Sequence, residues 1–327
     1  MNQTDIDRAG EMIRRGGLVA FPTETVYGLG ADATNEAAVR SVYAAKGRPS
    51  DNPMIVHIAD MEQLDELVTE VPSVARAMME IYWPGPITFV LKKSDVVPMV
   101  TTGGLDTIAI RMPSNRTARR LIRAARRPIA APSANLSGRP SPTTALDVLE
   151  DMDGRIDAVI MGDTCDVGIE STVCDLTGDV PTILRPGYIT AEMIQAKLGI
   201  DVVYDRSLFI SPENADFHPK SPGMKYKHYS PKANVIIVRG GDTEMRATRA
   251  YSILSLALSG DKNAKVVDYK GDSREAAHDF FARLRELDRE GVDTIIVTGL
   301  PEEGFGFSVM NRMLKAAGYN VVDSDKM

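Results

Sequence analysis

Short apolar runs alternate with helical patterns along the first 190 residues of the chain. Residues 18–21 are apolar and precede a proline, which is typical of a buried strand, and residues 54–58 have the same character. Between these runs, Thr34 or Asn35 can cap a helix whose apolar residues fall on one face, with Gly47 as its end. The pattern therefore predicts a strand–helix–strand unit close to the N-terminus.

Further helices and strands follow the same alternation. Thr4 can cap a first helix that ends near Gly16, and Thr190 can cap a later one. Ser141 followed by Pro142 also predicts a helix start, because proline is favoured at the first helical position. The other helical patterns cover residues 61–68, 73–82 and 115–127, and strands are predicted at 87–91, 107–111, 128–131, 158–161, 171–176 and 182–184.

Composition changes after about residue 206. Residues 211–231 contain four prolines and the mixed basic and aromatic run 225–229, which predicts a semi-rigid linker. Beyond it, β-branched runs (VIIV, VVDY and TIIV) alternate with helical patterns, including one from about 308 to 317. We therefore expect an α/β protein with a catalytic domain over 1–206, a linker or flap over 207–232 and a small Rossmann-like domain over 233–327.

The overall composition is that of a globular protein. With 43% hydrophobic and 25% charged residues, the chain can form a proper core. Its net charge of −7 argues against a surface built for non-specific nucleic-acid binding. Cys165 and Cys174 lack a metal-binding spacing and are interpreted as reduced thiols. The sequence shows neither a secretory signal nor an apolar run of about 18 residues, so we expect a cytoplasmic protein without membrane contact.

One helical pattern carries a stripe of arginines. Residues 116–127 place apolar side chains on one face, and a basic stripe of this kind can bind tRNA. The solvated face of an amphipathic helix is the favoured interpretation, and direct tRNA binding stays open. The stripe consists of Arg116, Arg119, Arg120, Arg123 and Arg127.

Groups suited to an anionic ligand gather around the first strand–helix–strand unit. Two threonines and a glutamate at 23–25 follow the first strand, where α/β proteins commonly bind ligands. A lysine and an arginine flank the predicted helix end at 46–48, and His57 lies in the next strand. Taken singly, such a lysine can complement the helix dipole and such a histidine can be packed in the core. Their proximity in the chain favours an anionic ligand.

Two segments in this unit resemble a known family. The sequence PTETVYGLG, followed by KGRPSDNPMIVHI, is similar to the threonylcarbamoyl-AMP synthases of the YrdC-like family, in their two-domain form. The resemblance implies a twisted mixed sheet with helices, followed by a smaller Rossmann-like domain. It also implies a nucleotidyltransferase that converts ATP, L-threonine and bicarbonate into L-threonylcarbamoyladenylate and pyrophosphate. The product would be handed to proteins that form N6-threonylcarbamoyladenosine in tRNA.

The resemblance also implies roles for single residues. Lys46 and Arg48 would bind phosphates and act as the catalytic residues. Mg²⁺ would be held mainly by the ATP phosphates, without a dedicated protein site. L-Threonine would contact Thr25, His57, Arg111, Ala131 and Ser171. ATP would contact Lys46, Arg48, Asn52, Thr107, Ser133, Asn135, Ser141 and Arg185, with Tyr229 and then Tyr226 from the linker.

Other functions fit the sequence less well. Residues 28–33 satisfy a dinucleotide GxGxxA pattern, but the only acidic candidate nearby, Asp51, lies in a loop before the second strand. A P-loop is absent. A hydrogenase-maturation carbamoyltransferase would need paired CxxC elements, which two cysteines exclude. A non-catalytic RNA-binding module that uses the arginine stripe and residues 225–229 is the main alternative; it would bind tRNA with steep salt dependence and release no pyrophosphate.

Overall fold

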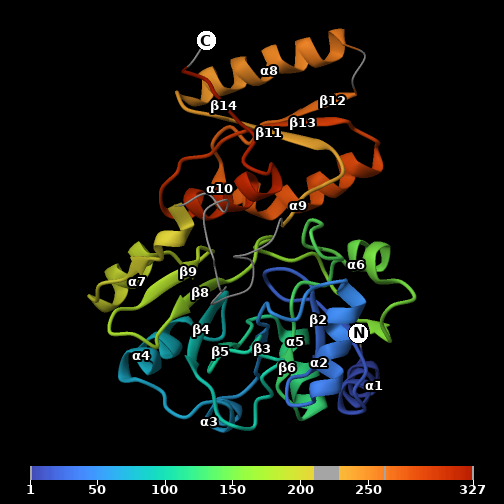
Figure 1. The fold of residues 1–327 in the computed structure, drawn as a ribbon, viewed down its shortest axis with the longest axis vertical. Coiled ribbons are helices and arrows are strands. Elements are labelled where there is room, and N and C mark those ends of the chain that lie inside the picture. Colours follow the sequence, from blue (N-terminus) through green and yellow to red (C-terminus); the bar gives the residue numbers. More distant parts are fainter. Residues whose placement is uncertain (1, 210–227, 261–262, 326–327) are drawn as a thin grey trace. The chain divides into compact units, whose positions relative to one another are not determined.

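The chain forms two compact units in the computed structural model, which describes residues 2–209, 228–260 and 263–325 (Figure 1). The first unit comprises Met1–Ser137, Pro142–Asp166 and Glu170–Tyr226, and the second comprises Gly138–Ser141, Val167–Ile169 and Lys227–Met327. Two short segments from the middle of the chain thus cluster with its C-terminal part.

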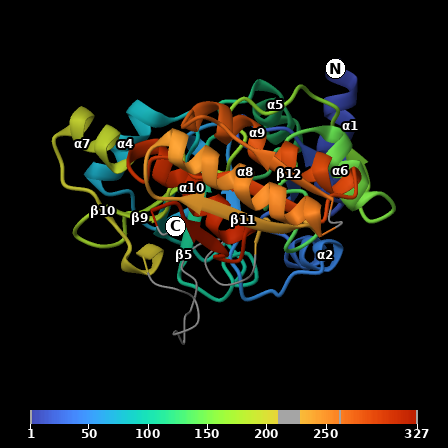
Figure 2. The ribbon, with the colours of Figure 1, turned by 90° about the horizontal axis from the view of Figure 1, so that it is seen from above.

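The second unit is built on a four-stranded parallel sheet with the order β12-β13-β11-β14. Helix α8 covers one face of this sheet, and α9 and α10 cover the other (Figures 1 and 2). This arrangement confirms the small Rossmann-like domain. Its elements are β11 (Asn234–Arg239), α8 (Thr243–Ser259), β12 (Ala264–Val267), α9 (Ser273–Arg289), β13 (Thr294–Thr298), α10 (Gly304–Ala316) and β14 (Val321–Asp323).

The first unit contains a ten-stranded mixed sheet with the order β10-β9-β8-β4-β5-β3-β6-β2-β1-β7. Parallel pairs such as β3–β5 and β4–β8 lie beside antiparallel pairs such as β4–β5, which confirms the expected mixed sheet. Its strands are β1 (Val19–Phe21), β2 (Gly28–Asp32), β3 (Ile55–His57), β4 (Ile87–Lys92), β5 (Thr107–Arg111), β6 (Ile129–Ala130), β7 (Ala158–Val159), β8 (Thr172–Asp175), β9 (Thr182–Arg185) and β10 (Val203–Tyr204).

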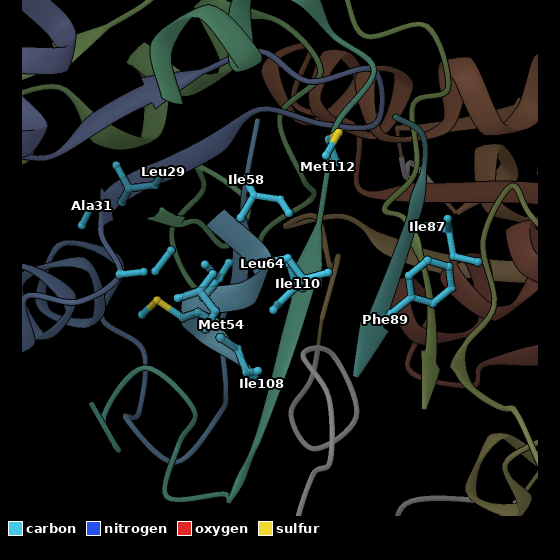
Figure 3. Packing of buried hydrophobic residues seen from close by; sticks show 14 of the residues in the cluster. Leu29, Ala31, Met54, Ile58, Leu64, Ile87, Phe89, Ile108, Ile110 and Met112 are labelled. Carbon is cyan, nitrogen blue, oxygen red and sulfur yellow. The ribbon is translucent and has the colours of Figure 1, made fainter. Parts of the chain in front are cut away.

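The helices of the first unit pack on both faces of this sheet, because successive strand residues point to opposite sides. Ala20 joins the larger core with α2, α3 and α4, whereas Val19 and Phe21 join a second core with α1 and α5. Figure 3 shows the larger core, in which Ile108 and Ile110 of β5 lie with Leu64 of α3. The helices are α1 (Gln3–Arg14), α2 (Glu36–Lys46), α3 (Glu62–Leu67), α4 (Ser73–Tyr82), α5 (Arg116–Ala125), α6 (Ala145–Met152) and α7 (Ala191–Leu198), followed by the 3₁₀ helix η1 (Arg206–Phe209).

Strand β2 is the main element that the sequence analysis missed. Its sequence, GLGAD, contains two glycines, which are depleted in strands. The structure explains them by close packing: a Cβ atom on Gly30 would lie 2.8 Å from Ile129 Cγ2 and from Phe21 Cε1. The predicted strand–helix–strand unit is therefore corrected to β2–α2–β3, with β1 forming an antiparallel hairpin with β2.

Two predicted helix caps are also corrected. Asn2 rather than Thr4 caps α1, and Thr144 rather than Ser141 caps α6 through a capping box with Asp147. The carbonyl of Pro142 accepts a hydrogen bond from the Tyr27 amide (2.9 Å), so this backbone is held by the start of β2 and does not turn into a helix there. The caps predicted for α2 and α7 are confirmed.

Both cysteines are free thiols, as expected. Both are also buried, and burial raises the pKa of each thiol to about 12. Within the described residues, no helix combines the length and the apolar character that crossing a membrane requires.

The contact between α1 and α5 depends on Gly10. A Cβ atom at this position would lie 2.6 Å from the Ala124 carbonyl carbon and 2.7 Å from the Ala125 amide nitrogen. Gly10→Ala should therefore lower the free energy of unfolding by about 1–3 kcal/mol through overpacking, although alanine is favoured over glycine in an isolated helix by about 1 kcal/mol.

Urea denaturation followed by Trp83 fluorescence tests this expectation, since Trp83 is the single tryptophan and belongs to the first unit. Arg8→Ala on the exposed side of α1 is the control and should change stability little. A more stable Gly10→Ala variant would contradict the packing argument.

Candidate active site

Five neighbouring strands of the first unit carry a small apolar cluster on the face of the sheet that also bears a group of polar side chains. Strands β3, β5, β4, β8 and β9 each contribute one buried residue to a small cluster separate from the two larger cores. The residues are Ile55, Ala109, Val90, Val173 and Leu184. Because side chains alternate along a strand, the polar residues two positions away on the same strands share this face. His57, Thr88 and Arg111 occupy such positions.

Arg111 is the centre of the polar group. It ends β5 directly beside His57, the last residue of β3, and its side chain is almost fully buried. Its Nη1 donates to Thr25 Oγ1 (2.8 Å) and its Nε donates to the Gly85 carbonyl (3.3 Å). Its Nη2 lies 2.7 Å from Glu24 Oε1 in an ion pair whose two side chains are only 4% and 6% exposed. Three residues expected in the L-threonine site, Thr25, His57 and Arg111, are thus brought together.

His57 is a buried neutral imidazole. Burial and then the Arg111 charge lower its pKa to about 3, and the opposing attraction of Glu24 is smaller. Its Nδ1 is buried and has no hydrogen-bond partner among the described residues. Atoms of this kind are rare in folded proteins and often mark a position that a ligand or water fills.

Ser171 and Arg185 form a second polar group, where β8 begins and the neighbouring β9 ends. Ser171 precedes β8 and shares a hydrogen bond with Thr88 on β4 (2.8 Å between the hydroxyl oxygens). Arg185, which ends β9, donates from Nε to the Ser171 carbonyl (3.0 Å) and from Nη2 to its hydroxyl (3.2 Å). One residue expected to contact L-threonine therefore lies against one expected to contact ATP.

Lys46 belongs to a third group, at the C-terminal end of α2. Its Nζ donates to the carbonyls of Ser133 and of Asn135, the latter at 2.6 Å, and the lysine is 3% exposed. The Ser133 hydroxyl donates to Asn135 Oδ1 (2.5 Å). This loop is anchored to the start of β2 by the isolated bridge between Gly28 and Ser133. Three residues expected in the ATP site therefore lie together.

Arg48 and Asn52 adjoin the same helix end. Arg48 donates to the carbonyls of Asn52 (3.2 Å) and Pro53 (3.1 Å), and its guanidinium carbon lies 5.9 Å from the centre of the Tyr43 ring. Arg48 also lines a surface hollow with Arg40 and Tyr43. Asn52 is fully buried, and both of its side-chain polar atoms lack a hydrogen-bond partner among the described residues.

The other expected site residues are placed less directly. Ala131 is buried, and its amide donates to the Ile55 carbonyl (2.9 Å). Thr107 begins β5, at the opposite end from Arg111, so the two are separated by about 13 Å along the strand. Ser141 is buried in a segment that clusters with the second unit. Tyr229 also belongs to that unit and packs on Phe281, with 5.0 Å between the ring centroids.

Tyr226 lies outside the described residues. The assignment of Thr107, Ser141, Tyr226 and Tyr229 to ATP therefore stays a prediction, as do the roles of the other site residues.

Two residues of the polar groups were not among the expected site residues. Glu24 was noted as a carboxylate between two threonines, but nothing in the local pattern indicated that it pairs with an arginine 87 positions later. Thr88 lies in a strand that looks apolar, ITFVL, and it is fully buried. The alternation of side chains could have identified it, because Thr88 points to the face opposite Ile87 and Phe89, which both lie in the larger core.

Three arginines of the stripe contact nearby polar side chains. Arg123 pairs with Asp60, Arg127 pairs with Asp32, and Arg120 donates to Gln3 Oε1 (2.8 Å). These contacts favour the interpretation as a solvated helix face, because carboxylates offset part of the positive charge that RNA phosphates would need.

Comparison with known proteins finds matches along almost the whole chain. A family model described as "Telomere recombination" matches residues 11–187, and one described as "Threonylcarbamoyl-AMP synthase, C-terminal domain" matches residues 189–318. A threonylcarbamoyl-AMP synthase of Pyrococcus abyssi is 48% identical over 324 residues, which cover 96% of this chain and 94% of the relative. The chain belongs to the threonylcarbamoyl-AMP synthase family. By its family it is an enzyme.

Further relatives of this family match over most of their length. The threonylcarbamoyl-AMP synthase of Bacillus subtilis is 43% identical and covers 98% of this chain and 95% of its own. The crystal structure of P. abyssi Sua5 complexed with L-threonine has a TM-score of 0.91 and 46% identity, and the match covers 99% of this chain and 97% of that one. E. coli YciO, with a TM-score of 0.53 and 27% identity, matches 59% of this chain and 94% of its own.

The lowered pKa of His57 makes a prediction about pH. Below pH 6.5 the unfolded chain binds a proton at this histidine, whereas the folded protein does not until the pH approaches about 3. The neutral form of His57 therefore stabilises the folded protein fully above pH 6.5, and this stabilisation is lost progressively as the pH falls below 6.5. Between pH 7.5 and 5, the free energy of unfolding should drop by about 2 kcal/mol from this residue alone.

Urea denaturation at a series of pH values, followed by Trp83 fluorescence, measures this dependence. His57→Gln should flatten it, and His278→Asn, which changes an exposed histidine of the second unit, should leave it intact. An unchanged pH dependence in His57→Gln would show that the neutral imidazole of His57 does not cause the loss of stability at low pH.

Proposed function

We propose that the enzyme is a nucleotidyltransferase that forms L-threonylcarbamoyladenylate from L-threonine, bicarbonate and ATP, with release of pyrophosphate. The observation that carries this proposal is the match of almost the whole chain to P. abyssi Sua5, which was crystallised in complex with L-threonine. The buried polar group around Arg111 supports it, because Arg111, Thr25 and His57 offer the charge and hydrogen-bonding groups that an amino acid requires.

In this reaction the neutral amine of L-threonine bonds to the carbon of bicarbonate, the C–OH bond breaks, and the hydroxide leaves as water with one amine proton. A carboxylate oxygen of the resulting carbamate bonds to the α-phosphorus of ATP as the bond from that phosphorus to the oxygen bridging to the β-phosphate breaks. Pyrophosphate then leaves. The protein contributes mainly alignment and stabilisation of negative charge. Lys46 suits this task because the Ser133 and Asn135 carbonyls fix the direction of its ammonium group. Arg185 is likewise fixed by Ser171, next to the residues proposed to hold L-threonine.

Mg²⁺ is proposed to enter with ATP. No group of three His, Cys, Asp or Glu side chains in the described part of the chain is arranged to hold a metal ion. The ammonium group of Lys46, directed by the Ser133 and Asn135 carbonyls, supplies a positive charge that suits phosphate oxygens. The ion would be held by those phosphates and by water, where it would neutralise charge on the pyrophosphate that leaves.

The adenylate is a reactive mixed anhydride, so it needs a prompt acceptor. We propose that it passes to proteins that modify tRNA in the cytoplasm. A purely RNA-binding role has no specific support, because two arginines of the stripe, Arg123 and Arg127, pair with Asp60 and Asp32, and the relatives are named as synthases.

The assay for this function is pyrophosphate release by the full-length protein. Release should require both L-threonine and bicarbonate, and Lys46→Ala should lower kcat/KM by about 100-fold or more, since one preorganised charge contact to the phosphates is lost. Arg48→Ala should also lower it. Lys92→Ala, which removes a lysine from an exposed pair with Glu70, is the matched control and should retain activity.

Pyrophosphate release that does not depend on L-threonine would rule out the proposed substrate. Equal activity of Lys46→Ala and Lys92→Ala would remove Lys46 from the phosphate site.

A further inference from the structure

We propose that Glu24 is a positioning residue that makes the amino-acid site selective for ligands with an ammonium group. Its carboxylate fixes Arg111 and balances its charge, so that a ligand carboxylate binds well only when it brings a positive charge of its own. The inference rests on the proposed function, because it assumes that L-threonine binds at Arg111.

The first argument is the position of Glu24. It lies between Thr23 and Thr25 in the turn that joins β1 and β2, and it is 5% exposed. Both partners of its ion pair with Arg111 are buried. Removing two charges from water carries a large desolvation cost, so a buried pair is weak evidence for a role in stability. A role in binding gives a better reason for the pair.

The second argument comes from the hydrogen bonds of Arg111. A guanidinium has five N–H groups. Two of them donate to the Gly85 carbonyl and the Thr25 hydroxyl, and Nη2 lies 2.7 Å from Glu24 Oε1 in the ion pair, so the group is restrained at all three nitrogens. Nη1 keeps one N–H and Nη2 makes no hydrogen bond among the described residues, so both terminal nitrogens can donate to a ligand carboxylate. Without Glu24, one of these three restraints disappears.

The third argument concerns the hydroxyl of Thr25. The Thr23 hydroxyl donates its only hydrogen to the Val26 carbonyl (2.6 Å), because a carbonyl can only accept. In the 2.8 Å pair of the two threonine hydroxyls, Thr25 must therefore be the donor. Since Thr25 Oγ1 also accepts from Arg111, only an acceptor position is left on it. It can receive an N–H or O–H of a ligand and cannot donate to a carboxylate.

Together these groups form a site for a dipolar ligand. Arg111 offers donors for a carboxylate, while Thr25 and Glu24 offer acceptors for an ammonium group. Burial acts to raise the pKa of Glu24, but the charge of the Arg111 guanidinium 2.7 Å away, together with backbone hydrogen bonds, holds the pKa below its usual value, so Glu24 is ionised at neutral pH. A ligand with only a carboxylate would bring a second negative charge beside Glu24 in a buried place, where like charges repel strongly.

The test measures binding of two ligands to the full-length protein by titration calorimetry. The ligands are L-threonine and 3-hydroxybutyrate, which is L-threonine without its amino group. The proteins are wild type, Glu24→Gln, Glu24→Asp, and Asp60→Asn as a control that breaks an exposed ion pair. For each protein the ratio of the two dissociation constants reports selectivity for the ammonium group.

Wild type and Asp60→Asn should bind L-threonine at least about tenfold more tightly than 3-hydroxybutyrate. In Glu24→Gln this ratio should fall by about tenfold, with 3-hydroxybutyrate binding better than it does to wild type. Glu24→Asp, which keeps the charge, should restore selectivity. A general loss of structure would weaken the binding of both ligands and would not make 3-hydroxybutyrate bind more tightly than it does to wild type.

The outcomes separate the two proposals. If wild type does not bind L-threonine, the proposed function fails. If wild type binds L-threonine but the ratio is the same in Glu24→Gln, the role of Glu24 fails while the function stands. If Glu24→Gln does not fold, the wild-type ratio decides: binding of 3-hydroxybutyrate within about threefold of L-threonine would overturn the role, since it corresponds to less than one charge contact.

Discussion

The alternation of side chains across the ten-stranded sheet is the constraint on which the rest of the first unit depends. On strands β3, β4 and β5, one set of residues packs into the core with α2, α3 and α4, and the next set lies on the opposite face. Ile108 and Ile110 belong to the first set, and Arg111 to the second. A slip of one residue in register would exchange the two sets. The large apolar core therefore fixes where the polar groups point.

The sequence contained enough information for most elements but not for all of them. Apolar runs and caps predicted α2, α4 and β5 with bounds close to those observed. Strand β2 was missed because its glycines carry no strand preference, and their reason appears only when Phe21 and Ile129 are packed against Gly30. The cap of α6 was misplaced because Ser141 and Pro142 have a local helix-start pattern. The hydrogen bond from Tyr27 to Pro142 that overrides it is a tertiary contact.

The site was predictable in part for a similar reason. A family resemblance can assign residues such as Lys46, Ser133 and Asn135, and the structure brings these three together. It says nothing of what each cation touches. Arg123 and Arg185 look alike in a sequence, yet Arg123 pairs with a carboxylate on the surface and Arg185 is buried against the backbone and hydroxyl of Ser171. The acceptor around a cation is set by tertiary packing, so sequence patterns do not distinguish these two uses.

The nature of that acceptor has a consequence for the chemistry. Lys46, Arg48 and Arg185 each donate to backbone carbonyls, which fix the direction of an N–H group but do not themselves cancel its charge. N–H groups whose direction is fixed in this way can align phosphate oxygens with little reorganisation. Arg111 is held by a carbonyl and also by the full charge of Glu24. An amino acid carries one charge of each sign, so a site with one guanidinium and one carboxylate matches its dipole. The pair of Arg111 and Glu24 thus gives a physical reason why an amino acid, rather than an anion alone, would bind at this group of polar side chains.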